Sequence, residues 1–133
     1  MKPQIFELAI TVGPEHIDTQ NHVNNLVYLQ WCLEAAEKHW TRNASTKHLE
    51  NYVWYVVKHE ISYKAPAFEG EEVVVKTWVE SNEGVRSERR YEIWNPQQNK
   101  KLVEAKTLWC LLLAKTQRPH PIPEEICKLF TDE

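Results

Sequence analysis

Between Leu26 and Trp40 the sequence reads LVYLQWCLEAAEKHW. Apolar residues recur at helical spacing along two neighbouring stripes, and the stripes are Leu26, Leu29, Leu33, Ala36 and Trp40 beside Tyr28, Trp31, Cys32 and Ala35. Only Gln30, Glu34, Glu37, Lys38 and the following Thr41 are left to face water. A helix that is apolar over most of its circumference has to be enclosed. The rest of the chain must therefore supply a cover for this helix.

The remaining chain has the period of β-strands. Alternation of apolar and polar residues predicts strands at Ile5–Val12, Val53–Lys64, Glu72–Glu80, Val85–Trp94 and Leu102–Leu113, with a short helix opening at Glu124 and Glu125. The turns between the last four strands are too short for parallel crossovers, so the strands should form one antiparallel sheet. We expect an α+β fold in which a curved antiparallel sheet of about five strands wraps around one long central helix.

The second face of this sheet also needs cover. Strict alternation places Trp54, Val56 and Trp78 on that face among charged residues. We therefore expect a homodimer or homotetramer.

Length and charge exclude several classes of protein. The 133 residues fit a single domain spanning 1–133, and 19 acidic against 16 basic residues without a Lys/Arg block give no footprint for nucleic acid. Only three glycines are present, whereas a dinucleotide-binding fingerprint, a phosphate-binding loop and a nucleophile-elbow serine each need two or more glycines within a few residues. The sequence therefore excludes these three motifs.

Cysteine usage and hydropathy indicate a reducing, aqueous setting. Cys32, Cys110 and Cys127 are odd in number and lack metal-binding spacing, so we expect free thiols and no metal. The longest apolar run, Leu108 to Ala114, is too short to span a bilayer, and Met1-Lys2-Pro3-Gln4 leads into a short mixed segment without the apolar h-region of a signal peptide. We expect a cytoplasmic protein without a membrane span.

The densest polar cluster, His16 to Tyr28, lies just before the apolar helix. A helix N-terminus offers unpaired N–H groups to an anion, and Asp18 could be brought to the same place by a loop. The alternative interpretation is structural, because Asp and Asn before a helix also serve as caps and Asx-turns. His16 and His22 have no third ligand at a suitable spacing, which favours structural histidines.

Three stretches resemble hotdog-fold acyl-CoA thioesterases of the 4-hydroxybenzoyl-CoA thioesterase type. Asp18-x-x-Asn21-His22-Val23-Asn24-Asn25-x-x-Tyr28 is similar to the family signature D-x-x-G-H-V-N-N-x-x-Y. Ile61 to Val73 resembles the family strand I-x-Y-x-x-P-A-x-x-G-D-x-V, and Arg118-Pro119-x-x-Ile122-Pro123 resembles its closing segment. The curved sheet around one helix is also the family's fold.

The resemblance implies roles for individual residues. Asp18 would act as nucleophile or general base, and the backbone N–H near Asn25 would hold the thioester oxygen. His22 and Asn24 would shape the loop, while Tyr28 would line the acyl pocket. Asn21 stands where the family has Gly, and Asn is among the non-Gly residues that best tolerate a left-handed backbone.

Further positions are assigned on chemistry. Glu34 matches a family position but lies too far along the helix from Asn25 to share its site, so we interpret it as structural. The basic candidates for the phosphates of coenzyme A are Arg86, Arg89, Arg90 and Arg118. No cofactor is expected.

Three functions are therefore compared. The first is an acyl-CoA thioesterase with active sites at a subunit interface. The second is an acyl-carrier-protein thioesterase, which would need a basic docking rim for its acidic carrier. The third is a protein that binds acyl-CoA without cleaving it, which the unpaired carboxylate of Asp18 disfavours.

Overall fold

A computed structural model describes residues 2–132. In chain order the elements are β1 (Lys2–Pro3), β2 (Phe6–Thr11), the 3₁₀ turn η1 (Pro14–His16), α1 (Asn25–Asn43), α2 (Thr46–Asn51), β3 (Tyr52–Tyr63), β4 (Glu72–Glu83), β5 (Arg86–Asn95), β6 (Lys100–Leu113), α3 (Glu124–Lys128) and β7 (Thr131–Asp132). The long helix and the main strands match the sequence-based expectation. Sequence reasoning missed η1, α2, β1 and β7, which are all short and lack a full period of hydrophobic pattern.

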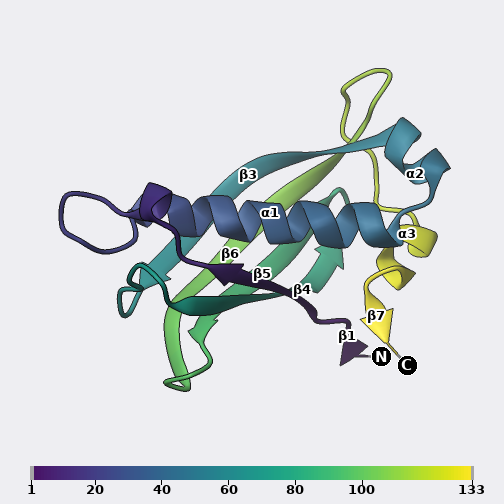
Figure 1. Cartoon of the computed structure of the whole chain (residues 1–133). Helices are drawn as coiled ribbons and strands as arrows, with labels where there is room; N and C mark the ends of the chain where they lie inside the picture. The colour runs from purple at the N-terminus through teal and green to yellow at the C-terminus, as the bar shows by residue number, and fades with distance from the viewer. Residues whose placement is uncertain (1, 133) are drawn as a thin grey trace.

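The main sheet has five strands in the order β2-β4-β5-β6-β3, and every neighbouring pair is antiparallel. Helix α1 lies across one face of this sheet, and the strands curve around it (Figure 1). This arrangement confirms the predicted α+β hotdog architecture. β1 and β7 form a separate two-stranded sheet that brings the two ends of the chain together.

Helix α1 begins with a side-chain cap. The Asn24 side chain accepts a hydrogen bond from the Leu26 N–H at 2.9 Å, which satisfies one of the free donors of the first turn. The buried side is the stripe Tyr28, Trp31, Cys32, Ala35, Ala36 and His39. Leu26, placed in the other apolar stripe by spacing alone, is 68% exposed.

The sheet buries alternate residues against α1. Val73, Val75 and Thr77 of β4 are fully buried, and Tyr91 and Ile93 of β5 face the same core. Burying a Val or Ile side chain contributes about 1.5–3 kcal/mol to folding. The pairing of these strands with the Tyr28 and Trp31 stripe therefore fixes the position of the helix on the sheet.

One strand differs from strict alternation. The β3–β6 register shifts between Val56 and Lys58, so an extra residue sits in β3 at Val57. Before the bulge Trp54 faces the helix and packs edge-on against Trp40 at 5.8 Å. The expectation that Trp54 lies on the outer face is therefore wrong, and the side chains that are exposed there are Tyr55 and Val57.

The outer face of the sheet is covered by ion pairs. Lys106 and Lys58 both bind Glu60, and Lys101 binds Glu92 and Glu104. Within residues 2–132 no helix combines the length and apolarity needed to cross a bilayer.

Candidate functional site

A tight loop before α1 carries Asp18. Ile17 pairs with Val23 as an isolated antiparallel bridge, and the Asp18 N–H donates to the His22 carbonyl at 3.0 Å. Asn21 closes the turn with a φ of 64°, the left-handed conformation expected of the residue that replaces the family's Gly. The loop is anchored to the connection between β3 and β4 because the Val23 N–H donates to the Ala67 carbonyl at 3.0 Å.

The Asp18 carboxylate is partly open to solvent. Oδ1 accepts a hydrogen bond from the Gln20 N–H at 2.8 Å and lies 3.8 Å from His22 Nδ1. The side chain keeps 24% of its surface exposed. The Asx-turn predicted as the structural alternative is present, and it fixes the carboxylate while leaving Oδ2 without a hydrogen-bond donor among residues 2–132.

The first turn of α1 leaves one backbone donor beside this loop. The Leu26 N–H is capped by the Asn24 side chain, and the Val27 N–H donates to the Asn24 carbonyl at 2.9 Å. Within the part of the chain that the structure describes, the Asn25 N–H has no acceptor. The Asn25 carbonyl accepts from the Tyr63 hydroxyl at 3.1 Å, which holds the start of the helix against β3. A carboxylate and an open helix N-terminus are thus presented by consecutive segments.

Tyr28 and His22 support this loop. Tyr28 is only 2% exposed, and its hydroxyl accepts a hydrogen bond from the Ala67 N–H at 2.8 Å. Tyr28 thus sits in the core of this chain, where its phenol ties α1 to the loop before β4. His22 Nδ1 donates to the Val23 carbonyl at 3.2 Å, so the ring is oriented by the backbone.

The four arginines do not form one patch. Arg89 and Arg90 are neighbours on β5, so they lie on opposite faces of the sheet. Arg90 pairs with Glu88 at 3.0 Å on the outer face, whereas Arg89 is 5% exposed beneath the helix. Arg86 and Arg118 are exposed at the start of β5 and after β6. Only these last two keep the open position that a phosphate ligand needs.

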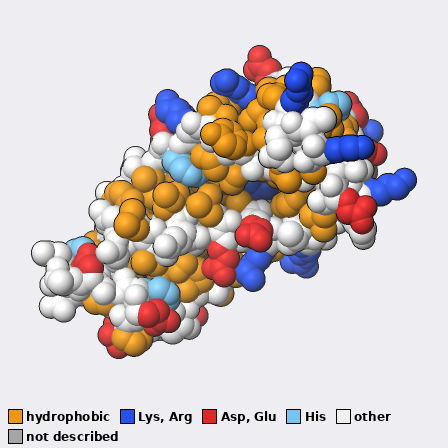
Figure 2. Space-filling view, turned by 90° about the horizontal axis from the view of Figure 1, so that it is seen from above, with side chains coloured by type: hydrophobic (Ala, Val, Ile, Leu, Met, Phe, Trp, Pro, Cys, Tyr) orange, Lys and Arg blue, Asp and Glu red, His pale blue; other side chains and the backbone are white. Residues whose placement is uncertain are grey.

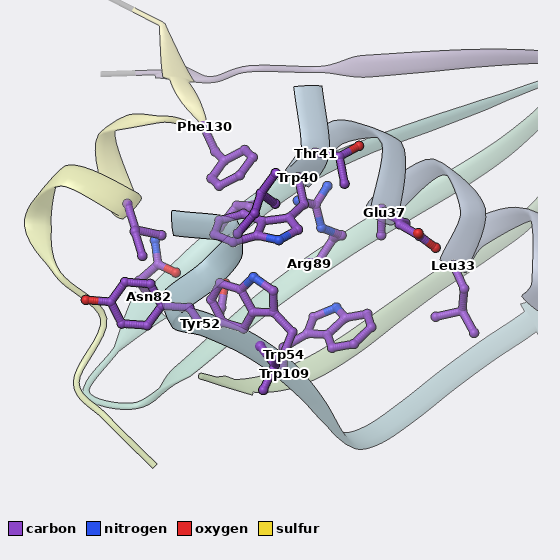
Figure 3. A pocket seen from close by; sticks show the side chains of 16 residues that line it. Leu33, Glu37, Trp40, Thr41, Tyr52, Trp54, Asn82, Arg89, Trp109 and Phe130 are labelled. Carbon is purple, nitrogen blue, oxygen red and sulfur yellow. The ribbon is translucent and has the colours of Figure 1, made fainter. Parts of the chain in front are cut away.

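The principal cavity lies toward the opposite end of α1 from Asp18. It has a volume of about 430 Å³ and opens between the second half of α1, the start of β3, the inner face of the sheet and α3. Figure 3 shows the indoles of Trp40, Trp54 and Trp109 together with the Arg89 side chain at this cavity. On the surface, hydrophobic side chains gather along the face seen in Figure 2, while charged groups lie mainly toward its edges.

Arg89 belongs to a buried polar cluster at the wall of the cavity. Its Nη1 donates to His39 Nδ1 at 2.9 Å and to the Thr77 hydroxyl at 3.1 Å, and its guanidinium lies over the Phe130 ring at 5.5 Å. Burial and the neighbouring cations Arg89 and Arg42 lower the pKa of His39 to about 3. The neutral imidazole therefore accepts from Arg89 at Nδ1 and donates from Nε2 to Gln4 Oε1 at 2.8 Å.

This cavity was not predicted from the sequence. One signal was available, because Arg89 shares its parity along β5 with Tyr91 and Ile93, and a residue of that parity must face the core. The three tryptophans gave no comparable signal, since Trp40, Trp54 and Trp109 are far apart in sequence and meet only in the fold. Among residues 2–132, no group of three or more His, Cys, Asp or Glu is placed to hold a metal ion.

Comparison with known proteins gives the class of the fold. The chain superposes on a 1,4-dihydroxy-2-naphthoyl-CoA thioesterase from Synechocystis with a TM-score of 0.82 and 21% identity, covering 94% of each chain. It superposes on a hypothetical protein from Staphylococcus aureus in complex with CoA with a TM-score of 0.84 and 18% identity, covering 97% of this chain and 83% of that one. It also superposes on a 12:0-ACP thioesterase from Umbellularia californica with a TM-score of 0.82 and 16% identity, covering 97% of this chain and 51% of that one. These neighbours share the hotdog fold of thioesterases.

The family follows from the sequence. Residues 4–130 match the family described as the acyl-ACP thioesterase N-terminal domain, and the chain belongs to that family. No curated protein matches the chain. The protein is a thioester hydrolase, which confirms the enzyme class predicted from the sequence. The narrower resemblance to the 4-hydroxybenzoyl-CoA type stays a prediction.

Proposed function

We propose that the protein hydrolyses acyl-CoA thioesters, with Asp18 as the catalytic carboxylate and the Asn25 N–H as the donor to the oxyanion. The observation that supports this most directly is a partly exposed carboxylate, held by an Asx-turn, in the loop that leads into a 19-residue helix whose Asn25 N–H has no acceptor among residues 2–132. The sequence from Asp18 to Tyr28 also supports the proposal. Its resemblance to the thioesterase signature implies the same roles for the Asp18 carboxylate and the Asn25 N–H.

The chemistry needs little more than these groups. Asp18 attacks the thioester carbonyl carbon directly or removes a proton from the attacking water, and the carbonyl oxygen gains negative charge. The Asn25 N–H and the positive end of the α1 dipole stabilise that charge. The coenzyme A thiolate then leaves and takes up a proton. In the direct route the acyl group is left on Asp18 as a mixed anhydride, and water hydrolyses it to the acid and the free carboxylate. By either route the net reaction consumes one water and yields a carboxylic acid and a thiol. A thiolate leaves readily, which is why no Ser/His pair is required.

Other residues contribute by holding the site. The His22 ring and the Asn24 cap fix the loop and the first turn, and the buried Tyr28 hydroxyl holds the neighbouring Ala67 backbone. Arg86 and Arg118 are the exposed cations that we assign to the phosphates of coenzyme A. A second subunit would complete the substrate pocket, because Asp18 does not line the principal cavity of its own chain.

Thiol release from short, medium, long-chain and aromatic acyl-CoAs tests the proposal. Asp18→Asn should lose most of the turnover and keep acyl-CoA binding, because the amide occupies the same Asx-turn without the charge. Glu34→Gln is the matched control, since Glu34 is an exposed carboxylate on α1 with no ion pair among residues 2–132. Normal turnover in Asp18→Asn, or loss of turnover in Glu34→Gln, would contradict the assignment. Tight binding without release by the wild type would indicate a non-catalytic binder.

The family match supports a second substrate class, acyl-carrier protein. Such a carrier is acidic, so its docking would depend on cations at the rim and would weaken as salt is raised. Comparing release from the same acyl group on coenzyme A and on a carrier protein, at low and high salt, separates the two. A large preference for the carrier-linked substrate that disappears at high salt would show that acyl-carrier protein, and not acyl-CoA, is the substrate.

Solvent-oxygen labelling distinguishes the two roles proposed for Asp18, attack on the thioester carbonyl carbon and activation of a water molecule. Only direct attack puts label into the Asp18 carboxylate.

A further inference from the structure

The principal cavity contains a cation without a counterion. Arg89 lines it, and no carboxylate among residues 2–132 lies within ion-pair distance of its guanidinium. The one acidic residue at the cavity, Glu37, is exposed, and its carboxylate points away from Arg89 in Figure 3. Charged groups at this depth are normally paired, so an isolated guanidinium requires an explanation.

The protein uses only part of the hydrogen-bonding capacity of Arg89. A guanidinium has five N–H donors, and both contacts to protein, with His39 and Thr77, come from Nη1. Nε and Nη2 have no acceptor among the described residues. These two nitrogens form the fork that matches the two oxygens of a carboxylate in a bidentate pair. The neutral His39 fixes the guanidinium without neutralising it.

The rest of the cavity suits an apolar body. The lining includes the apolar side chains of Trp40, Trp54, Trp109, Phe130 and Ile126, and the volume of about 430 Å³ lies within the range of small-molecule sites. Trp40 is packed edge-on against Trp54 and stacked near Phe130, so the aromatic wall is built before any ligand arrives.

We propose that this cavity binds a carboxylic acid with an apolar body, its carboxylate paired with Arg89 and its apolar part held among the three tryptophans. The carboxylate can belong to a free acid or to the far end of the acyl group of a thioester. Binding of the acyl group of a thioester rests on the proposed acyl-CoA hydrolysis, whereas binding of a free acid does not.

Binding of decanoate and decan-1-ol to the wild-type protein tests the charge directly. Tryptophan fluorescence and calorimetry are suitable readouts, because three of the six tryptophans line the cavity. Decanoate should bind about tenfold more tightly or better, as expected for one charge-assisted hydrogen-bonded pair. Equal affinities for the acid and the alcohol, or no binding of either, would overturn the proposal.

Two variants assign the effect to Arg89. Arg89→Gln should bind both ligands with the affinity of the alcohol, and Arg89→Lys, which keeps the charge and loses the fork, should fall between that variant and the wild type. Arg90→Gln is the matched control, since Arg90 is the next residue of β5 but faces outward. Preference for decanoate that survives in Arg89→Gln, or disappears in Arg90→Gln, would contradict the assignment. If Arg89→Gln does not fold, the comparison of decanoate with decan-1-ol in the wild type and in Arg89→Lys still tests whether Arg89 binds the carboxylate.

Kinetics with matched thioesters separates the two sources. If the acyl group supplies the carboxylate, kcat/KM for decanedioyl-CoA should exceed that for decanoyl-CoA, and Arg89→Gln should remove the difference. If a free acid supplies it, the two thioesters should react alike while decanoate binding still depends on Arg89. Absence of any turnover would count against the proposed hydrolysis only, because the binding experiment needs no activity.

Discussion

Asn21 has a backbone conformation that most residues avoid. Its φ of 64° lies in the left-handed region, where a Cβ costs about 1–2 kcal/mol and Asn is better tolerated than other side chains. Asn21→Ala should therefore lower the free energy of unfolding by about 1 kcal/mol, while Asn21→Gly should leave it nearly unchanged. Urea denaturation of both variants checks this. Equal effects of Ala and Gly would mean that the loop does not hold the turn that presents Asp18.

His39 gives the protein a calculable pH dependence. Its pKa is about 3 in the folded state, against 6.5 ordinarily, because burial and the cations Arg89 and Arg42 oppose protonation. Above pH 6.5 neither state holds the proton, and the full contribution to stability is present. Below that value the unfolded chain takes up a proton that the folded chain refuses, so the free energy of unfolding falls by up to about 1.4 kcal/mol per pH unit until about pH 3.

The test is a comparison of slopes. Unfolding free energies of the wild type and His39→Gln, measured from about pH 7 to about pH 5, should converge as pH falls, because only the wild type has this histidine to protonate. Exposed carboxylates such as Glu60 contribute equally to both proteins and cancel in the difference. Parallel curves would show that His39 is protonated in the folded protein.

At the scale of elements, the Tyr28 hydroxyl holds α1 to the connection between β3 and β4. The Tyr28 hydroxyl accepts from the N–H of Ala67, and both residues are buried. Tyr28→Phe leaves that N–H without a partner, which should lower the free energy of unfolding by about 1–3 kcal/mol. Tyr63→Phe is the control, because the partly exposed Tyr63 hydroxyl can be replaced by water, and its effect should stay within about 0.5 kcal/mol. Similar losses in the two variants would argue against this anchor.

The elements also show what a sequence can and cannot predict. The period of apolar residues located α1 and the main strands, because period alone decides which residues can share a face. The same rule failed within β3, since one extra residue at Val57 reverses the facing of everything before it. A bulge adds no distinctive residue, so Trp54 was assigned to the wrong face although the strand itself was predicted correctly.

At the scale of the whole molecule, the site was predictable in part. Asp18 and Asn25 are close in sequence, so a local motif could place them together. The cavity instead joins α1, β3, β5, β6 and α3, and its aromatic wall depends on how those elements pack. No local pattern shows that Trp40 meets Trp54, and the inward parity of Arg89 was the only trace of the cavity in the sequence.

Strand β3 lies at one edge of the sheet, where a second subunit could pair with it. It is 12 residues long, and Tyr55 and Val57 are 62% and 43% exposed on it. A long apolar edge invites pairing with another strand, so we expect a dimer formed through β3. Tyr55→Lys combined with Val57→Lys should weaken that dimer, as measured by sedimentation, while Ser81→Lys on the interior strand β4 should not.

Thioesterase activity should depend on the equilibrium between monomer and dimer. Because Asp18 does not line the principal cavity of its own chain, a partner subunit would be needed to complete the substrate pocket. Specific thioesterase activity should then fall on dilution, and it should fall at higher protein concentrations in the double lysine variant than in the wild type. A monomer by sedimentation that retains full activity would show that one chain holds the whole active site, and the acyl group would then have to bind outside the Arg89 cavity.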